Sequence, residues 1–210
     1  MLSNLLEVVG DKWVAPRTIA DSICPFDLFF LAQLARHQGA QNITELGCGA
    51  TTVELSRLGY NLTTFSLEVS KAARKAEIRA SFIKCNVMDR GFLSQIIDSV
   101  KQSQLLVIDC LHTKEMARYY SENILPHADC LVWIHDYWYT TGYIPYGEQR
   151  YLDRNVIGKS HKVWTMTDRC VEDIEVISDQ IGHDITNQRH RRPLTKNYGP
   201  KMCSVVLEKM

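Results

Sequence analysis

The chain has 210 residues, of which 24 are basic and 24 acidic, so its formal net charge at neutral pH is zero. This balance excludes a uniformly cationic protein that binds nucleic acid mainly by neutralising phosphates. Hydrophobic residues make up 45% of the chain and charged residues 23%, which is typical of a folded globular protein. We therefore expect a single domain, residues 1–210, with a sizeable core.

Signals for the membrane, for secretion and for disulfides are weak in this sequence. It has no run approaching the ~18 uninterrupted apolar residues of a membrane-spanning helix. The first residues lack the positive lead-in of a signal peptide, because Glu7 and Asp11 come early. The seven cysteines are odd in number and include no CxxC pair, which favours reduced thiols. We expect a cytoplasmic protein.

The first part of the chain alternates helical and strand-like patterns. Residues 1–40 are expected to form a helical N-terminal extension, with apolar residues at helical spacing and Gly39 at its end. Strands and helices of about ten residues that alternate indicate βαβ units and a parallel sheet. The predicted strands are 43–46, 63–67, 81–87, 105–108 and 130–134, and the predicted helices are 53–58, 70–77, 92–100 and 115–125.

The C-terminal part has a different character. Residues 137–160 are rich in tyrosine and tryptophan, and Gly142, Pro145 and Gly147 predict a long aromatic loop without regular structure. Residues 161–167 and 202–208 are predicted to be the last two strands, with an insertion at 168–201 between them. The predicted fold class is α/β, a doubly wound Rossmann-like sheet that is mostly parallel, with an antiparallel C-terminal hairpin and helices on both faces.

The end of the first predicted strand carries a glycine-rich turn. In such sheets ligands bind beyond the carboxyl ends of the strands. Gly47 and Gly49 allow a sharp turn and a close approach of the backbone to a ligand, next to the start of a helix. Thr52 stands where the dinucleotide fingerprint has its third glycine, so the turn by itself also fits an ordinary strand–helix connection.

An acidic residue ends the second predicted strand. Glu68 lies 19 residues after Gly49, where a carboxylate can accept hydrogen bonds from the hydroxyls of a ribose. The alternative is that Glu68 only favours the start of the helix that follows it. The turn and the acid together favour a cofactor that contains a nucleoside.

These motifs resemble those of class I S-adenosylmethionine-dependent methyltransferases. The resemblance begins with Glu45-x-Gly47-x-Gly49 and Glu68 and continues with a third strand that ends at residues 84–87. It spans roughly residues 40–137. It implies S-adenosylmethionine as the cofactor. The cofactor-binding residues that it implies are Glu45, Gly47, Gly49, Thr51, Glu68, Asn86, Val87 and Asp109.

Two later segments narrow the resemblance to a subgroup. Residues 108–112, Ile-Asp-Cys-Leu-His, and residues 135–137, His-Asp-Tyr, are similar to a pattern of methyltransferases related to sugar O-methyltransferases and cephalosporin-hydroxylase-like proteins. The chain departs from the family at His127-Ala128-Asp129, where a glycine pair is usual, and at Asn86, where aspartate is commoner. The implied reaction is methyl transfer to a hydroxyl or amine of a small molecule, for example a sugar or a hydroxylated metabolite.

Four ionisable residues follow the fourth and fifth predicted strands, and we expect them to act on the acceptor: Asp109, His112, His135 and Asp136. The methyl donor is already activated, so the protein must mainly position a nucleophile and remove its proton. An imidazole can serve as the base near neutral pH. Alternatively, Asp109, His135 and Asp136 bind a divalent metal ion that orients a diol, although a histidine in this set weakens the case for magnesium. The structural alternative is that Asp109 caps the next helix and His135 packs at a strand end.

The aromatic segment and the insertion are candidates for contacts with the acceptor or with a second chain. Tyr137, Trp138 and Tyr143 are expected to line the acceptor site, or else to pack on the sheet edge or in a homodimer. The insertion is acidic at first and then basic, and Arg191 and Arg192 could steer an anionic acceptor. Two other classes stay open, a non-catalytic interaction module and a nicotinamide-dependent oxidoreductase, and the missing third glycine argues against the latter.

Overall fold

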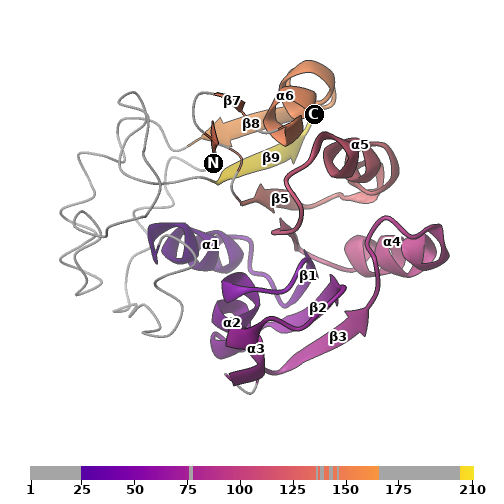
Figure 1. Ribbon diagram of the computed structural model, residues 1–210. Helices are drawn as coiled ribbons and strands as arrows, with labels where there is room; N and C mark the ends of the chain where they lie inside the picture. The colour runs from indigo at the N-terminus through magenta and orange to yellow at the C-terminus, as the bar shows by residue number, and fades with distance from the viewer. Residues whose placement is uncertain are drawn as a thin grey trace.

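The computed structural model describes residues 25–75, 78–135, 137, 140–141, 144–145, 147–165 and 204–210. Seven strands form one sheet in the order β3-β2-β1-β4-β5-β9-β8 (Figure 1). The strands are β1 (Asn42–Leu46), β2 (Asn61–Ser66), β3 (Ala80–Lys84), β4 (Leu105–Ile108), β5 (Leu131–Ile134), β8 (His161–Thr165) and β9 (Val205–Lys209). Strands β1 to β5 pair in parallel, and β9 is antiparallel to both of its neighbours. The predicted mostly parallel sheet with an antiparallel C-terminal pair is therefore confirmed.

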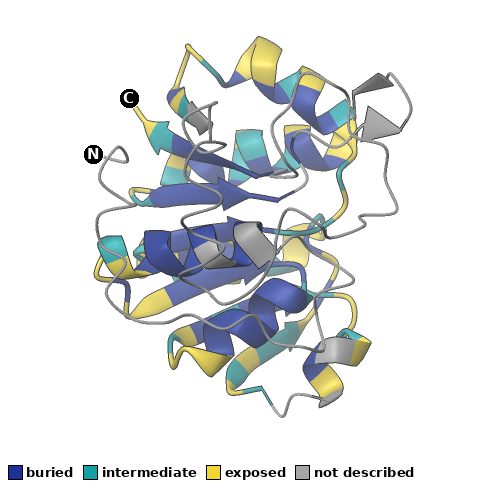
Figure 2. Ribbon diagram, turned by 90° about the vertical axis from the view of Figure 1, so that its left-hand side faces the viewer, coloured by how far each residue is buried: buried dark blue, intermediate teal, exposed yellow. Residues whose placement is uncertain are grey.

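Helices cover both faces of the sheet. The helices are α1 (Pro25–His37), α2 (Ala50–Arg57), α3 (Lys71–Lys75), α4 (Leu93–Lys101), α5 (Lys114–Asn123) and α6 (Gly147–Asn155), with 3-10 turns at Arg90–Phe92 and Leu125–His127. The core under α1, α2 and α3 contains Leu31, Ile43 and Trp133, and the core under α4, α5 and α6 contains Ile108 and Tyr120. Figure 2 shows the buried strands between these two layers. Apolar burial on both faces explains why β4 and β5 are continuous apolar runs.

The predicted aromatic loop at 137–160 is wrong in its second half. Residues Gly147–Asn155 form α6, and a two-stranded ribbon of β6 (Thr140–Thr141) and β7 (Ile144–Pro145) precedes the helix. Leu152 and Val156 are both buried at the spacing of one helical turn, so the segment has an apolar face that packs on the second core. Gly147 does not break the helix because it stands at its first residue, where a Cβ would lie 2.9 Å from the backbone nitrogen of Lys114.

The ends of the other predicted elements differ less from those in the structure. Strand β3 ends at Lys84, so Asn86 and Val87 lie beyond the strand rather than in it. The first helix is described from Pro25, and Gly39 ends it with a positive φ of 58°. The rest of the predicted N-terminal extension, residues 1–24, and the insertion at 168–201 lie outside the described residues.

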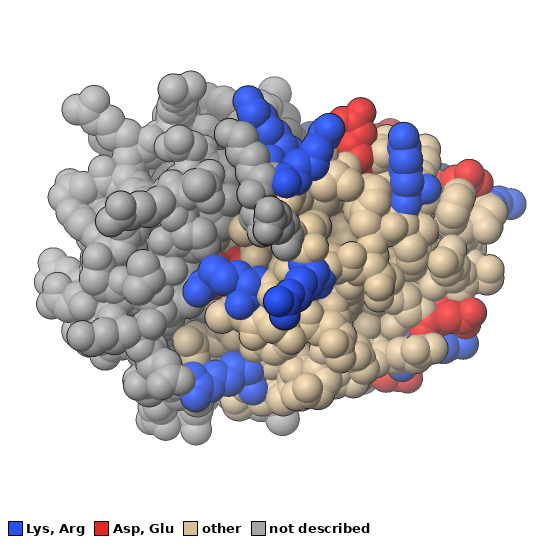
Figure 3. All heavy atoms as spheres, turned by 90° about the horizontal axis from the view of Figure 1, so that it is seen from below, with Lys and Arg blue, Asp and Glu red and all other residues tan. Residues whose placement is uncertain are grey.

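The surface charge is uneven although the net charge is zero. The face seen from below in Figure 3 carries lysine and arginine side chains over much of its middle. This is the side of α3 and β3, where Lys71, Arg74, Arg79 and Lys84 are exposed. No helix in the described part of the chain has the length and apolar character needed to cross a membrane.

Candidate active site at the carboxyl edge of the sheet

Strand register brings three predicted site residues side by side. Leu46 pairs with Ile108, and Ile108 pairs with Ile134. The ladder continues one residue further, because the backbone N–H of Asp109 donates to Leu46 (2.9 Å) and that of His135 donates to Ile108 (3.0 Å). Gly47, Asp109 and His135 therefore follow neighbouring strands at one edge, where ligands bind in α/β sheets.

The turn after β1 leaves no room for a side chain at its first glycine. Gly47 has a φ of 109°, and a Cβ on it would lie 1.9 Å from the carbonyl oxygen of Asp109. Gly49 is the N-cap of α2, and a Cβ there would lie 3.5 Å from Oδ2 of Asp109. The turn is thus packed directly against the end of β4.

Glu45 holds this turn from beneath. Its carboxylate is fully buried, and hydroxyls of Thr51 (2.5 Å), Thr52 (2.7 Å) and Thr64 (2.8 Å) donate to it. The Thr52 hydroxyl in turn accepts the backbone N–H of Gly49 at 2.9 Å. Burial raises the pKa of Glu45 to about 7, although the three hydroxyls act in the opposite direction. Glu45 and Thr51 were predicted to bind the cofactor, and the structure places both beneath the turn, where they position it.

Asp109 and His135 form a close pair. Oδ1 of Asp109 lies 3.1 Å from Nδ1 of His135, and the hydroxyl of Thr51 lies 3.0 Å from Oδ2. Burial by itself would raise the pKa of Asp109, but the charge and hydrogen bond of His135 and the Thr51 hydroxyl lower it below its usual value. The His135 ring stacks on Trp133, with ring centroids 5.5 Å apart. Asp109 does not cap α5, because Thr113 is the N-cap and its hydroxyl accepts from Met116.

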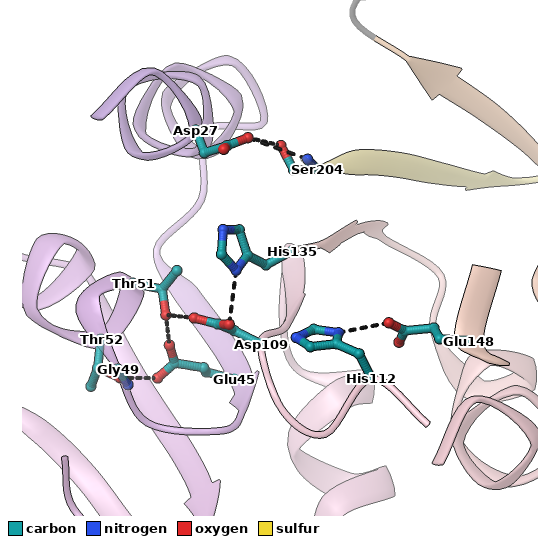
Figure 4. A network of polar contacts seen from close by, with 10 residues as sticks. All are labelled: Asp27, Glu45, Gly49, Thr51, Thr52, Asp109, His112, His135, Glu148 and Ser204. Atoms are coloured by element: carbon teal, nitrogen blue, oxygen red, sulfur yellow. Dashed lines mark hydrogen bonds and ion pairs between the residues drawn. The ribbon is translucent and has the colours of Figure 1, made fainter. Parts of the chain in front are cut away.

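A second histidine reaches the same place with a buried carboxylate behind it. Nδ1 of His112 lies 2.6 Å from Oε2 of Glu148, and the Tyr120 hydroxyl donates to Oε1 of Glu148 at 2.8 Å. Figure 4 shows the other ring nitrogen of His112 turned toward Asp109. Glu148 is fully buried on α6. Sequence reasoning missed it, since it lies in the predicted loop, although the Leu152 and Val156 spacing is a helical signal.

The three side chains converge. Donor atoms of Asp109, His112 and His135 all lie within 4.8 Å of one another. The structure thus brings together three of the four residues that were predicted to act on the acceptor. The fourth, Asp136, lies outside the described residues, as do Trp138 and Tyr143. Tyr137 is buried in the second core, and its hydroxyl donates to Asp153.

The remaining predicted cofactor residues follow β2 and β3. Glu68 is exposed two residues beyond the end of β2, and its carbonyl accepts from the Ser66 hydroxyl at 3.1 Å. Asn86 is exposed beyond β3, and its Oδ1 accepts the N–H of Met88 at 3.0 Å, which leaves its amide group as a donor. Val87 is buried. Glu68 and Asn86 thus present polar groups at the carboxyl edge.

A buried contact between α1 and β9 lies at the carboxyl edge of the sheet. Over the carboxyl edge, buried Asp27 of α1 accepts from the Ser204 hydroxyl at 2.5 Å, which ties α1 to the start of β9 (Figure 4). Sequence reasoning missed this contact, which joins residues 177 apart.

At the opposite edge lies a cavity of about 880 Å³, lined in part by Asn42, Asn61 and Arg79. That cavity is far from the converging side chains, since it surrounds the amino ends of β1, β2 and β3.

No protein-family profile matches the sequence, and no curated protein is detectably similar to it. Solved structures are similar in fold. An O-methyltransferase from Bacillus cereus in complex with S-adenosylhomocysteine is 16% identical, with 100% of this chain and 90% of that chain covered and a TM-score of 0.53. The O-methyltransferase TomG from Streptomyces achromogenes, involved in tomaymycin synthesis and bound to S-adenosylmethionine, is 13% identical, with 87% and 78% covered and a TM-score of 0.51. The chain has the fold of these O-methyltransferases, so the resemblance is confirmed at the level of the fold.

Proposed function

We propose that the protein transfers a methyl group from S-adenosylmethionine to a hydroxyl group of a small molecule. The observation that carries this proposal is the carboxyl edge, where a glycine turn packed on Asp109 adjoins the cluster of Asp109, His112 and His135. Two proteins of the same fold are O-methyltransferases bound to S-adenosylmethionine or its demethylated product, which supports the choice of cofactor.

The residues of the edge fit such a cofactor. S-adenosylmethionine supplies a methyl group on a sulfonium, which is already activated for displacement. Because Gly47 has no side chain, the turn can pack against the carbonyl of Asp109, which keeps the turn beside the cluster. The exposed carboxylate of Glu68 can accept hydrogen bonds from ribose hydroxyls, and the amide of Asn86 can donate to an adenine edge.

The acceptor hydroxyl would lie against the three converging side chains. His112 can act as the base through the ring nitrogen that faces Asp109, because its contact with Glu148 holds the ring in this orientation. Asp109 and His135 would orient the acceptor. A divalent ion held by the same side chains would lower the pKa of the hydroxyl instead. The proposed acceptor is a sugar or a hydroxylated metabolite, which Trp138 and Tyr143 would contact and which Arg191 and Arg192 would steer if it is anionic. Tyr137 was expected to do the same, but it is buried in the second core, which favours its packing role. A homodimer is also part of the proposal.

Calorimetric titration of the purified chain with S-adenosylmethionine and S-adenosylhomocysteine tests the proposal. We expect binding of one molecule per chain, and at least a tenfold loss of affinity in Glu68→Ala, since a hydrogen bond to a charged group contributes about 1.5–3 kcal/mol. Asp98→Ala on α4 removes an equally exposed carboxylate away from the site and should bind as the unchanged protein does. Absence of binding, or binding of reduced nicotinamide nucleotide in its place, would contradict the proposal.

A further inference from the structure

The cavity at the amino ends of β1, β2 and β3 has the properties of a second binding site. Its volume of about 880 Å³ is typical of pockets that hold small molecules. We propose that it binds a small polar molecule that carries an anionic group, either a phosphate or a carboxylate. The inference does not rest on the proposed methyl transfer, whose residues lie at the opposite edge of the sheet.

Strand register brings polar side chains together at this edge. Asn42 pairs with Asn61, and the pairing of Leu62 with Ala80 places Arg79 beside Asn61. Nδ2 of Asn61 donates to Oδ1 of Asn42 at 3.2 Å, which fixes the two amides relative to each other. The N–H groups of the Asn42 amide and the side-chain oxygen of Asn61 can therefore bond to hydroxyl groups of a ligand.

Helix α2 supplies a buried hydroxyl to the wall of the cavity. Ser56 is only 9% exposed, and its hydroxyl accepts the backbone N–H of Arg79 at 2.6 Å. The proton of this hydroxyl has no acceptor in the part of the chain that the structure describes. A buried donor without an acceptor is unfavourable, so an oxygen atom of a ligand in the cavity would be stabilised by Ser56.

The charges of the wall favour an anion. Arg57 and Arg79 line the cavity, and its wall contains no aspartate or glutamate among the described residues. Arg57 is paired with Glu54 at 2.7 Å, whereas the exposed side chain of Arg79 makes no ion pair within the described ranges. A guanidinium group binds the oxygens of a phosphate or a carboxylate through two parallel hydrogen bonds. Arg79 is therefore the residue that we expect to hold the anionic group.

The surroundings of the cavity are also favourable for an anion. Arg79 belongs to the basic face of α3 and β3, which carries the exposed Lys71 and Arg74 as well (Figure 3). Such a face raises the local concentration of anions. A cation would instead meet two arginines in the cavity and no carboxylate in its described wall.

The end of α2 does not reverse this preference. Carbonyl groups at the end of a helix repel an anion when they are unpaired. Here the backbone N–H groups of Leu58, Gly59 and Tyr60 donate to the last carbonyls of α2. The basic side chain of Arg57 lies in the last turn as well.

NMR titration of the isotope-labelled full chain with inorganic phosphate, and separately with acetate, tests this inference at constant ionic strength. We expect saturable shifts of the amide signals of Asn42, Ser56 and Arg79 with at least one of the two anions, with a Kd below about 10 mM. Arg79→Gln should weaken this binding about fivefold or more. Lys84→Gln is the matched control, because it removes a cation from the other end of β3, outside the cavity, and should bind as the unchanged protein does. The anion that binds more tightly identifies the group that the site prefers.

The inference is overturned if neither anion shifts these signals saturably. It is also overturned if Arg79→Gln and Lys84→Gln weaken binding equally, because the anion would then respond only to the field of the basic face. Melting midpoints identify a variant that fails to fold, and in that case the position of the shifted signals in the unchanged protein carries the test. Anion binding is measured without cofactor, so its failure leaves the proposed methyl transfer standing, and the reverse also holds.

Discussion

Gly47 is the residue on which the site depends most directly. Its positive φ is a backbone region that other residues adopt only with strain, and the carbonyl of Asp109 occupies the place of a Cβ. Gly59 also has a positive φ, 85°, but no atom lies within 4 Å of the place of its Cβ. Substitutions at the two glycines therefore distinguish the effect of backbone strain from the effect of a steric clash with a neighbouring residue.

Gly47→Ala should destabilise the protein clearly more than Gly59→Ala and should abolish cofactor binding. Gly59→Ala carries only the strain of a positive φ, about 1–3 kcal/mol, whereas Gly47→Ala also forces β1 and β4 apart. Chemical denaturation gives the two stabilities, and titration with S-adenosylhomocysteine gives the binding. Equal stabilities for the two variants, or a Gly47→Ala protein that binds normally, would show that the turn is not packed as described.

Glu45 and Asp109 share one hydrogen-bond donor, the hydroxyl of Thr51. The Thr51 hydroxyl lies near both Oε1 of Glu45 and Oδ2 of Asp109, but it has a single proton to donate. When Glu45 is protonated, it donates to Thr51, and Thr51 donates to Asp109. This arrangement agrees with a pKa of about 7 for the buried Glu45 carboxyl.

The pH dependence of stability follows from that pKa. Because folding raises the pKa of Glu45 from 4.5 to about 7, its contribution is fully present below pH 4.5 and is lost as the pH rises through 7. Glu45→Gln stays neutral, so the unchanged protein should lose stability relative to this variant between pH 5 and 8.5, on the order of 3 kcal/mol. Denaturation with a chelator present measures the difference, and Asp98→Asn is the control. A difference that does not vary with pH, or one that grows in the other direction, would contradict this assignment.

At the residue scale, sequence could place Asp109 and His135 together, because parallel strands end at one edge. The sequence also predicts the face of the sheet on which Glu45 lies. Glu45 shares its strand face with Ile43, which packs in the core under α1 and α2, so its side chain is expected on the side of α2. Glu148 could not be assigned in this way, because its contact with His112 joins residues 36 apart through the packing of α6 on α5.

Helix α6 is the element that links the fold to the site. It packs beside α5, and Tyr120 of α5 donates to Glu148 of α6 in a buried position. A second contact between the two helices, from the Tyr151 hydroxyl to Glu122 at 3.3 Å, is exposed. A buried carboxylate that loses a donor is destabilised much more than an exposed one.

Tyr120→Phe should therefore lower the free energy of unfolding by about 1–3 kcal/mol. Tyr151→Phe should change it by less than about 0.5 kcal/mol. Urea denaturation of both variants at neutral pH measures the pair. The packing assigned to α6 would be wrong if the two substitutions had equal effects, or if Tyr151→Phe had the larger one.

Sequence patterns predicted the strands more accurately than they predicted helix α6. The apolar strands were placed within two or three residues, because runs such as Leu105–Ile108 are buried on both faces and leave few alternatives. Helix α6 was missed, because glycine and proline next to aromatic residues are typical of loops and outweighed the buried pair Leu152 and Val156. Local composition cannot show that Gly147 is needed for the close approach to Lys114, which is a tertiary contact.

At the scale of the whole molecule, the strand order places the site. The chain moves outward from β1 through β2 to β3 and then crosses to β4 on the other side of β1. The connections after β1 and β4 thus diverge to opposite faces, which opens the carboxyl edge between them. The alternation of strands and helices predicted a doubly wound sheet, because parallel crossovers have few solutions, but it did not give the strand order. It could not predict the cavity at the amino edge, whose walls come from β1, β2, β3, α2 and the end of α4 together with the segments that connect them.

A crystal structure of the chain with S-adenosylhomocysteine tests the central claim most directly, which is that the carboxyl edge is the cofactor site. We predict the ligand over the turn at Gly47, with its ribose hydroxyls on Glu68 and its sulfur facing Asp109, His112 and His135. A ligand bound instead in the amino-edge cavity beside Asn42 and Arg79, or a homocysteine moiety directed away from Asp109, would contradict the account.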